Sequence, residues 1–501
     1  MHACHAHPVQ TGLIGRQLIL KEIRPPKGCK CDGWLFIYVF HITLNGQSGA
    51  AKQAPHRHWP PQTTGRMGAK PVSMGAAIAH QDDAMTPVSA DDTLGHWTQR
   101  AGHQAWLMQQ ANGLFDFFER GFIDPAGGFF DLRADGTPLD AAGQVHPVHI
   151  SARAVHCFAI GALMGRPGAR AVVDHGMDYL WHRHRDQTNG GYFWSLKGEP
   201  LDRTKQGYGH AFVLLAASSA KLIGHPLADP MLADITEVLD THFWEEKHGA
   251  IAEEFTEDWQ PLDGGTYRGQ NSNMHLTEAL MAAYEATGDA EYLRKAKRIA
   301  ERVIGQAARS VGWRVAEHFT TDWGLDRSYY HPNEMFRPAG TTPGHWLEWA
   351  RLILQLWVLD GKTEDWMTEA ARGLFRQSMA LGWDRQQGGF FYTLDWDDVP
   401  AKRSKLWWPA CEGVAAAHFL NELCPDPEWE TAYRQIWDVI ARAFVDRHHG
   451  GWHEELTEDL IPTTTLFPGK GDIYHALQAC LIPTRPAIGS LTRAMLMTRE
   501  A

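Results

Sequence analysis

The chain has 501 residues, enough for one large domain or for two to three ordinary ones, and 44% of them are hydrophobic. A formal net charge of −12 and a pI near 6.1 argue against nucleic acid or an anionic membrane as the main partner, because both attract basic patches. The seven cysteines are scattered and fit neither a disulfide framework nor a four-ligand zinc site. This usage favours a reducing compartment and predicts a cytoplasmic protein.

Residues 1–95 differ from the rest of the chain. They contain His- and Pro-rich runs, such as residues 56–61, and show no sustained period. The apolar run 34–42 is shorter than the roughly 20 residues that span a bilayer, and no clean signal-peptide cleavage site follows it. We predict a disordered extension, or upstream sequence translated from too early a start, with Met74 or Met85 as the true first residue.

From residue 97 onward a unit of roughly sixty residues repeats, and this repeat decides the expected fold. Its marker is a glycine pair followed by an aromatic residue. Clear copies lie at residues 127–129, 190–192, 388–390 and 450–452, and weaker ones at 249–251 and 312–314.

Between the markers, apolar residues recur at spacings of three and four, as in 106–118, 276–284, 346–359 and 415–423. Such spacing predicts helices, and a sixty-residue unit with two helices and a turn is a helical hairpin. Six hairpins can close into a double ring. We therefore predict an all-α fold, an (α/α)6 barrel, over residues 96–490. An open helical solenoid is the alternative, but a closed ring would bring the polar residues of distant units around one cavity.

Three polar segments interrupt the apolar pattern, at residues 268–278, 337–349 and 470–475. Each runs from a glycine-containing loop into a predicted helix and places a histidine near the helix start: His275, His345 and His475. Loops at one end of a barrel commonly carry the site. These segments are therefore the first candidates for chemistry.

His345 and Glu348 are three residues apart, as are His275 and Glu278, so each pair shares a helix face. A carboxylate beside an imidazole fixes its tautomer and raises its basicity, which suits a general base. Metal ligation is the competing interpretation, but the spacing is not the His-Glu-x-x-His of zincins. We predict no metal and no cofactor.

Other polar and aromatic residues suit a sugar. The chain has 21 tryptophans and 28 histidines, and indole faces stack on sugar C–H faces. Arg153 lies three residues before His156, and Tyr208 could donate a hydrogen bond to a sugar hydroxyl. Trp408 and Glu412 share a predicted helix start. No phosphate-binding glycine loop, nucleophile elbow or dinucleotide fingerprint is present in the sequence.

The order of these segments resembles the N-acylglucosamine 2-epimerase superfamily, in its D-mannose isomerase and sulfoquinovose isomerase branch. The resemblance covers residues 97–486 and is carried by three stretches, residues 271–275, 342–349 and 472–475. It implies an (α/α)6 barrel and metal-independent aldose–ketose isomerisation through a cis-enediol.

The resemblance also implies roles. His345 and His475 match the acid/base histidines, with Glu348 supporting His345. We expect His475 to carry the proton between C2 and C1, and His345 to serve ring opening and the oxygens. The resemblance implies substrate contacts at seven matched positions: Arg153, Tyr208, Asn271, His275, Arg337, Trp408 and Glu412. We add Glu454 and Asp472 as two further candidate substrate contacts.

Two departures from the branch bear on the substrate. Sulfoquinovose isomerases have glutamines where this chain has Gly471 and Glu454. Losing two amide donors and gaining a carboxylate disfavours a sulfonate, since two unit charges ~4 Å apart repel by about 4 kcal/mol at an effective dielectric of 20. A small neutral monosaccharide is expected, with D-mannose converted to D-fructose and D-lyxose to D-xylulose as a side activity.

Several alternatives stay open at this point. Within the superfamily they are a sugar 2-epimerase and a sulfoquinovose isomerase. A glycoside hydrolase or lyase on the same barrel would need paired carboxylates, and no such pair stands out. A non-catalytic sugar-binding protein would show no turnover. We expect a monomer or a homodimer, with neither nucleic acid nor membrane as a partner.

Overall fold

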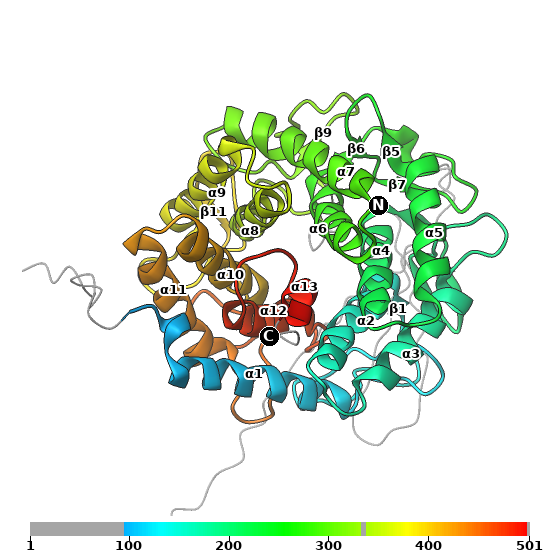
Figure 1. Ribbon diagram of the computed structural model, residues 1–501, viewed down its shortest axis with the longest axis horizontal. Coiled ribbons are helices and arrows are strands. Elements are labelled where there is room, and N and C mark those ends of the chain that lie inside the picture. The colour runs from blue at the N-terminus through cyan, green and yellow to red at the C-terminus, as the bar shows by residue number, and fades with distance from the viewer. Residues whose placement is uncertain (1–94, 332–336, 498–501) are drawn as a thin grey trace, which may run out of the picture. The chain divides into compact units, whose positions relative to one another are not determined.

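The computed structural model describes residues 95–331 and 337–497, all within one compact unit, residues 83–501. The predicted N-terminal extension lies outside the described residues, apart from Gly95. Within them, twelve helices alternate between an outer and an inner ring (Figure 1). This is the predicted (α/α)6 barrel, and the prediction of an all-α fold is confirmed.

The inner ring consists of six helices that follow one another around the centre: α2 (Val148–Leu163), α4 (Gly207–Leu222), α6 (Gln270–Thr287), α8 (Pro343–Leu359), α10 (Trp407–Leu423) and α12 (Tyr474–Leu481). The outer ring consists of α1 (Ala101–Glu119), α3 (Ala169–Tyr179), α5 (Ala228–Val238), α7 (Ala290–Ala300), α9 (Asp365–Gln377) and α11 (Pro427–Val439).

Burial explains why the two rings have different sequences. In α10 every residue from Trp407 to Asn421 is buried, because an inner helix is covered on all sides. In the outer helix α7 the buried residues fall on one face, as Tyr292, Ala296 and Ile299 illustrate. The apolar periodicity therefore separates the two kinds of helix.

Most outer helices end in a π-helical turn, after which a long connection returns to the next inner helix. These turns are η3 (Leu180–His184), η4 (Leu239–Phe243), η6 (Glu301–Ala308), η7 (Ser378–Gly382) and η8 (Ile440–Phe444). Short 3-10 helices are η2 (Trp97–Gln99), η5 (Leu262–Gly265) and η9 (Ile482–Thr484).

The long connections carry short antiparallel strands. The pairs are β4 (Lys205–Gln206) with β7 (Glu254–Phe255), β5 (Trp244–Glu245) with β6 (Ala250–Ile251), β8 (Arg268–Gly269) with β9 (His318–Phe319), β10 (Thr393–Leu394) with β11 (Pro400–Lys402), and β12 (Lys405–Leu406) with β13 (Glu455–Leu456). A three-stranded sheet joins β1 (His146–Pro147), β2 (Ser195–Lys197) and β3 (Glu199–Asp202).

The repeated glycine marker has a backbone cause. The marker glycines at 128, 191, 249, 312, 389 and 451 all have positive φ, a conformation that glycine adopts without steric cost. The turn lets the following aromatic residue pair back with the end of the outer helix, as in Arg185–Tyr192 and Val445–Trp452. The sequence repeats because each hairpin uses a turn with a glycine of positive φ at the same place.

Buried ion pairs fix the starts of several inner helices. Lys205 binds Asp186 at 2.9 Å, and its Nζ also donates to the carbonyl of Gly190 at 2.9 Å. Lys405–Asp384 and Lys470–Asp446 repeat this arrangement in later hairpins. Each lysine lies within four residues of the inner helix that follows. The pairs therefore tie these helix starts to the turns of the preceding hairpins.

The C-terminal segment covers the other end of the inner ring. Gln355 Nε2 in α8 donates to the Gly489 carbonyl at 3.0 Å, and the Ser490 amide donates to Glu285 in α6 at 3.0 Å. The last helix, α13 (Leu491–Met497), packs on α2 and α6 (Figure 1). None of the helices described here is both long enough and apolar enough to cross a membrane.

Candidate active site

Polar side chains gather where the inner helices begin, at the end of the ring opposite the C-terminal segment. Each of the six helices contributes at least one, α4 through the partly buried Tyr208, which accepts a hydrogen bond from Arg153. The buried members on which the site is built are Arg153, Gln270, His275, Glu278, His345, Glu348, Arg351, Trp408, Glu412, Asp472 and His475. Segments far apart in sequence therefore form one cluster.

His345 lies in the first turn of α8, and its ring is held by a carboxylate. Its Nδ1 is 2.9 Å from Glu317 Oε1 and 3.0 Å from Oε2. Gln270 Nε2 donates to Glu317 Oε2 at 2.9 Å, and Trp349 Nε1 donates to Gln270 Oε1 at 2.7 Å, which fixes the amide orientation. With Nδ1–H committed to Glu317, a neutral imidazole presents Nε2 as the base.

Glu348 was expected to support His345, but the structure pairs His345 with Glu317. Side chains on a helix lean towards its N-terminus, so His345 leans out of the helix start towards the residues that precede α8. Glu348, one turn later, lies 3.7 Å from His275 Nδ1 and 3.6 Å from Arg351. The shared helix face did not produce the expected contact.

His475 is held in the same way by a different carboxylate. Its Nδ1 is 2.9 Å from Glu412 Oε1, while Arg351 Nε donates to Glu412 Oε2 at 2.7 Å. Glu412 was expected to contact substrate. That contact stays a prediction; in the structure both oxygens of Glu412 are bound by His475 and Arg351, and Glu412 is only 1% exposed. The structure therefore gives it a supporting position behind His475.

Arg351 connects the carboxylates of the cluster and was not singled out from the sequence. Its residue is fully buried, and it contacts Glu278 at 3.2 Å and Glu348 at 3.6 Å in addition to Glu412. Burial opposes the ionisation of Glu278 and Glu412, but Arg351 keeps the pKa of each below its usual value. Its signal in the sequence is an arginine inside the apolar stretch 346–359.

Glu348 is the carboxylate that Arg351 neutralises least. Burial, followed by repulsion from Glu412, raises the pKa of Glu348 well above its usual value. It belongs to both groups of close potential metal ligands in the described residues, His275–Glu278–Glu348 and Glu348–Glu412–His475. Arg351 contacts all three of these glutamates, so its positive charge already offsets part of their negative charge.

A second polar group faces the cluster from α2 and α4. Arg153 forms an ion pair with Asp472 at 2.5 Å and donates to the Tyr208 hydroxyl at 2.8 Å. The Trp408 ring lies near both histidines, with its centroid 4.9 Å from His345 and 5.9 Å from His475. An indole close to two imidazoles can stack against a sugar ring that the imidazoles also reach.

The remaining predicted substrate contacts are placed differently. The buried Asn271 Oδ1 and His275 Nδ1 have no hydrogen-bond partner among the described residues. Burial lowers the pKa of His275 to about 3, so its ring is neutral. Glu454 accepts the backbone N–H of Asp472 at 2.8 Å. Arg337, in contrast, pairs with Glu254 at 2.8 Å.

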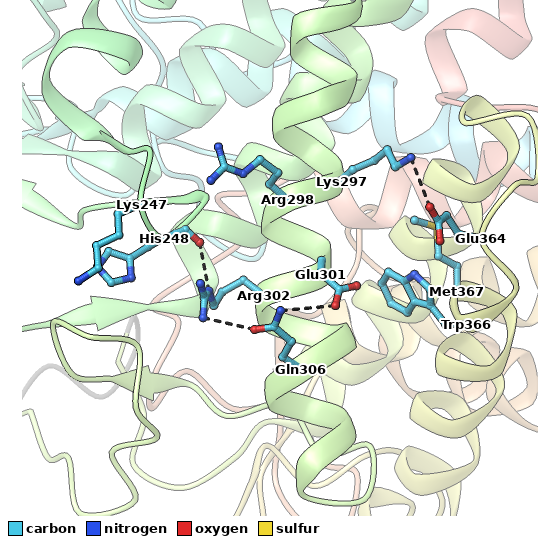
Figure 2. A pocket seen from close by; sticks show the side chains of 10 residues that line it. All are labelled: Lys247, His248, Lys297, Arg298, Glu301, Arg302, Gln306, Glu364, Trp366 and Met367. Atoms are coloured by element: carbon cyan, nitrogen blue, oxygen red, sulfur yellow. Dashed lines mark hydrogen bonds and ion pairs between the residues drawn. The ribbon is translucent and has the colours of Figure 1, made fainter.

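A groove on the outer ring is distinct from this cluster (Figure 2). It has a volume of about 410 Å³ and lies between α7–η6 and the start of α9. Two of its cations are already paired, Arg298 with Glu246 and Lys297 with Asp360. None of the helix-start histidines lines it. The centre of the inner ring is therefore the better candidate for the active site.

Comparisons with known proteins agree with this fold. The family model of N-acylglucosamine 2-epimerase matches residues 127–479. A D-mannose isomerase from Pseudomonas cannabina pv. alisalensis is 39% identical over 410 residues, covering 80% of this chain and 98% of that protein. A D-mannose isomerase from Thermobifida fusca is 40% identical over 408 residues, with the same coverage.

A solved structure is also similar. The crystal structure of a D-mannose isomerase superposes with a TM-score of 0.70 at 34% identity, covering 76% of this chain and 97% of that one. The similarity thus extends over nearly the whole length of these relatives. The chain belongs to the N-acylglucosamine 2-epimerase family and is an enzyme of its sugar isomerase and epimerase group.

Proposed function

We propose that the protein interconverts D-mannose and D-fructose and acts on D-lyxose and D-xylulose as a side activity. The observation that carries the proposal is the pair of imidazoles, His345 and His475, each bound through Nδ1 to a buried carboxylate and both facing Trp408. The relatives named D-mannose isomerase support the choice of sugar.

The proposed reaction moves one proton between two carbons. After ring opening, Nε2 of His475 removes the proton from C2 of the aldose while O1 gains a proton, which gives a cis-enediol. Return of the proton to C1 and loss of the O2 proton give the ketose. His345 is assigned to ring opening and to proton transfer at the oxygens. Placed acid/base groups typically contribute ~10²–10⁴-fold.

The supporting residues have separate duties in this scheme. Glu317 and Glu412 hold the two imidazoles in the tautomer that leaves Nε2 free as a base. Arg153, Tyr208, Asn271 and His275 offer polar atoms to the sugar hydroxyls. Glu348, in the same cluster, is assigned a contact with the bound sugar.

We also propose that no metal ion takes part. The carboxylates that could hold one are Glu278, Glu348 and Glu412, and Arg351 contacts each of them. A divalent ion would add charge beside a buried guanidinium, which is unfavourable in a low-dielectric environment.

The test is a substrate panel followed by NMR, with and without a chelator. The panel contains mannose, lyxose, glucose, N-acetylmannosamine, cellobiose and sulfoquinovose. Mannose should give fructose in both conditions. Glucose without fructose would show a 2-epimerase instead, and loss of activity with the chelator would overturn the metal-free scheme. The His475→Asn variant is the control for contaminating isomerases.

A further inference from the structure

Asp131 reaches the candidate site from the first long connection of the barrel. Leu132 forms a β-bridge with Lys470, and the Lys470 amide donates to the Leu132 carbonyl at 2.7 Å. This register places Asp131 beside Gly471, the residue just before Asp472. A Cβ atom added to Gly471 would lie 2.9 Å from Asp131 Oδ1. The missing side chain at 471 therefore makes room for the Asp131 carboxylate.

The carboxylate of Asp131 is held in place on one side only. Gln144 Nε2 donates to Asp131 Oδ2 at 3.0 Å, and the Asp131 amide donates to Gln144 Oε1 at 3.2 Å. The other oxygen, Oδ1, is the atom that approaches Gly471. The geometry fixes both the position of the charge and its direction.

Asp131 adds to two carboxylates that already lie at this edge of the site, Glu454 and Asp472. Burial, and then repulsion from Asp472 and Asp131, raise the pKa of Glu454 well above its usual value. One facing cation is Arg153, which is paired with Asp472. Beside Asp131 lies His146, which is 3.4 Å from Asp124. Lys470, which is paired with Asp446, also interacts electrostatically with Glu454, so two cations, each already paired, lie near the three acidic side chains.

We propose that Asp131 is a specificity-determining residue that excludes anionic sugars. Together with Glu454 and Asp472 it forms an acidic edge whose carboxyl oxygens accept hydrogen bonds from sugar hydroxyls. The members of this edge that are ionised repel a phosphate or sulfonate. The substrate class is an uncharged monosaccharide. This inference rests on the proposed function, because it takes the centre of the inner ring as the sugar site.

The experiment compares kcat/KM for mannose and for mannose 6-phosphate in the wild type, Asp131→Asn and a matched control. The control is Asp135→Asn, which removes the same charge from an exposed side chain of the same connection. Asp131→Asn should raise the ratio of phosphorylated to neutral substrate by about 10- to 100-fold. The Asp135→Asn variant should leave this ratio unchanged.

The outcomes separate the two proposals. If the wild type does not isomerise mannose, the proposed function fails and this inference falls with it. If mannose is isomerised but the ratio is the same in Asp131→Asn and in the wild type, only the role of Asp131 is overturned.

A second pair of variants tests the contact itself, independently of how well Asp131→Asn folds. Gly471→Ala places a methyl group against Asp131 and should lower kcat/KM for mannose. In the Asp131→Ala background, where that space is empty, Gly471→Ala should cause little further loss. An equal loss from Gly471→Ala in both backgrounds would show that Asp131 does not occupy the space beside Gly471.

Discussion

The two histidines at the centre of the ring are held by carboxylates of different origin. Glu317, the partner of His345, precedes β9 in a long connection and is buttressed by the neutral amide of Gln270. Glu412, the partner of His475, lies on the adjacent inner helix and is bound by Arg351. Each histidine thus lies 2.9 Å from a carboxylate. The carboxylate of His345 comes from a connection and is bound by a neutral amide, whereas that of His475 comes from a helix and is bound by a charged guanidinium.

This difference suits a division of labour. Arg351 contacts Glu412, Glu278 and Glu348, so the surroundings of His475 form a buried network of charges that should restrict movement of its ring. The surroundings of His345 contain one carboxylate and an amide. A proton that must move between two fixed carbons needs the more rigidly held base, whereas ring opening involves a group that changes position. This contrast supports His475 as the carbon base.

The largest expected effect comes from removing either imidazole. His345→Asn and His475→Asn should each lower kcat for mannose by about 10²–10⁴-fold. D-glyceraldehyde is too short to close a pyranose ring, so ring opening is not needed for its isomerisation. On this substrate His345→Asn should retain much more of the wild-type rate than His475→Asn. Coupled-enzyme assays of the ketose product measure both.

The exposed His182, changed to Asn, is the control and should leave turnover unchanged, because its side chain is 57% exposed. Equal losses for the two active-site variants on glyceraldehyde would remove the proposed division of labour. A larger loss for His345→Asn would reverse it.

Replacing the two carboxylates by amides should have an intermediate effect. A hydrogen bond to a charged group contributes about 1.5–3 kcal/mol, so Glu317→Gln and Glu412→Gln should each lower kcat by about 10- to 150-fold. Only Glu412→Gln also removes a negative charge from buried Arg351. It should therefore lower the thermal unfolding midpoint more than Glu317→Gln does. Steady-state kinetics and calorimetry provide the measurements.

Glu369 pairs with Arg309 on the surface, so Glu369→Gln is a control for which both quantities should stay unchanged, as exposed ion pairs contribute little. If Glu317→Gln destabilises the protein as much as Glu412→Gln, the two settings are not electrostatically different.

The contrast also shows which parts of the site local sequence reveals. The barrel could be predicted because the same glycine turn recurs in each hairpin. His345 and His475 stood out because they interrupt apolar helices at their starts. Glu317 did not stand out, and Glu412 was singled out only as a substrate contact, because Glu317 is 28 residues from His345 and Glu412 is 63 residues from His475. Such contacts exist only once the ring closes.

Arg351 and Asp131 also could not be identified as site residues from the local sequence. Arg351 lies inside an apolar stretch, where periodicity treats a lone arginine as a minor interruption, although three buried glutamates surround it. Asp131 lies in a connection without a helical period. Its relevance comes from the bridge between Leu132 and Lys470, which joins the first and last hairpins.

The smallest expected effect is on the pH dependence of stability, and it concerns a histidine that is bound by neutral groups and not by a carboxylate. His210, in the first turn of α4, donates from Nδ1 to the Gln206 carbonyl at 2.7 Å and accepts the Tyr192 amide at Nε2 at 3.0 Å. Burial lowers the pKa of His210 to about 3. Protonation would remove the acceptor that the Tyr192 amide needs, so the folded protein keeps this ring neutral.

The sign of the pH effect follows from this lowered pKa. Because the pKa is about 3 in the folded state and about 6.5 in the unfolded chain, the unfolded chain binds the proton first as the pH falls. His210 therefore stabilises the fold fully above pH 6.5, and this contribution declines by up to about 1.4 kcal/mol per pH unit between pH 6.5 and 3. His210→Gln should unfold in urea with a midpoint that falls less steeply between pH 7 and 5 than the wild-type midpoint. His182→Gln is the control and should keep the wild-type slope. An equally steep slope in His210→Gln would mean that the acid sensitivity arises from other buried histidines. His184 and His275 are such residues, because burial also lowers the pKa of each to about 3.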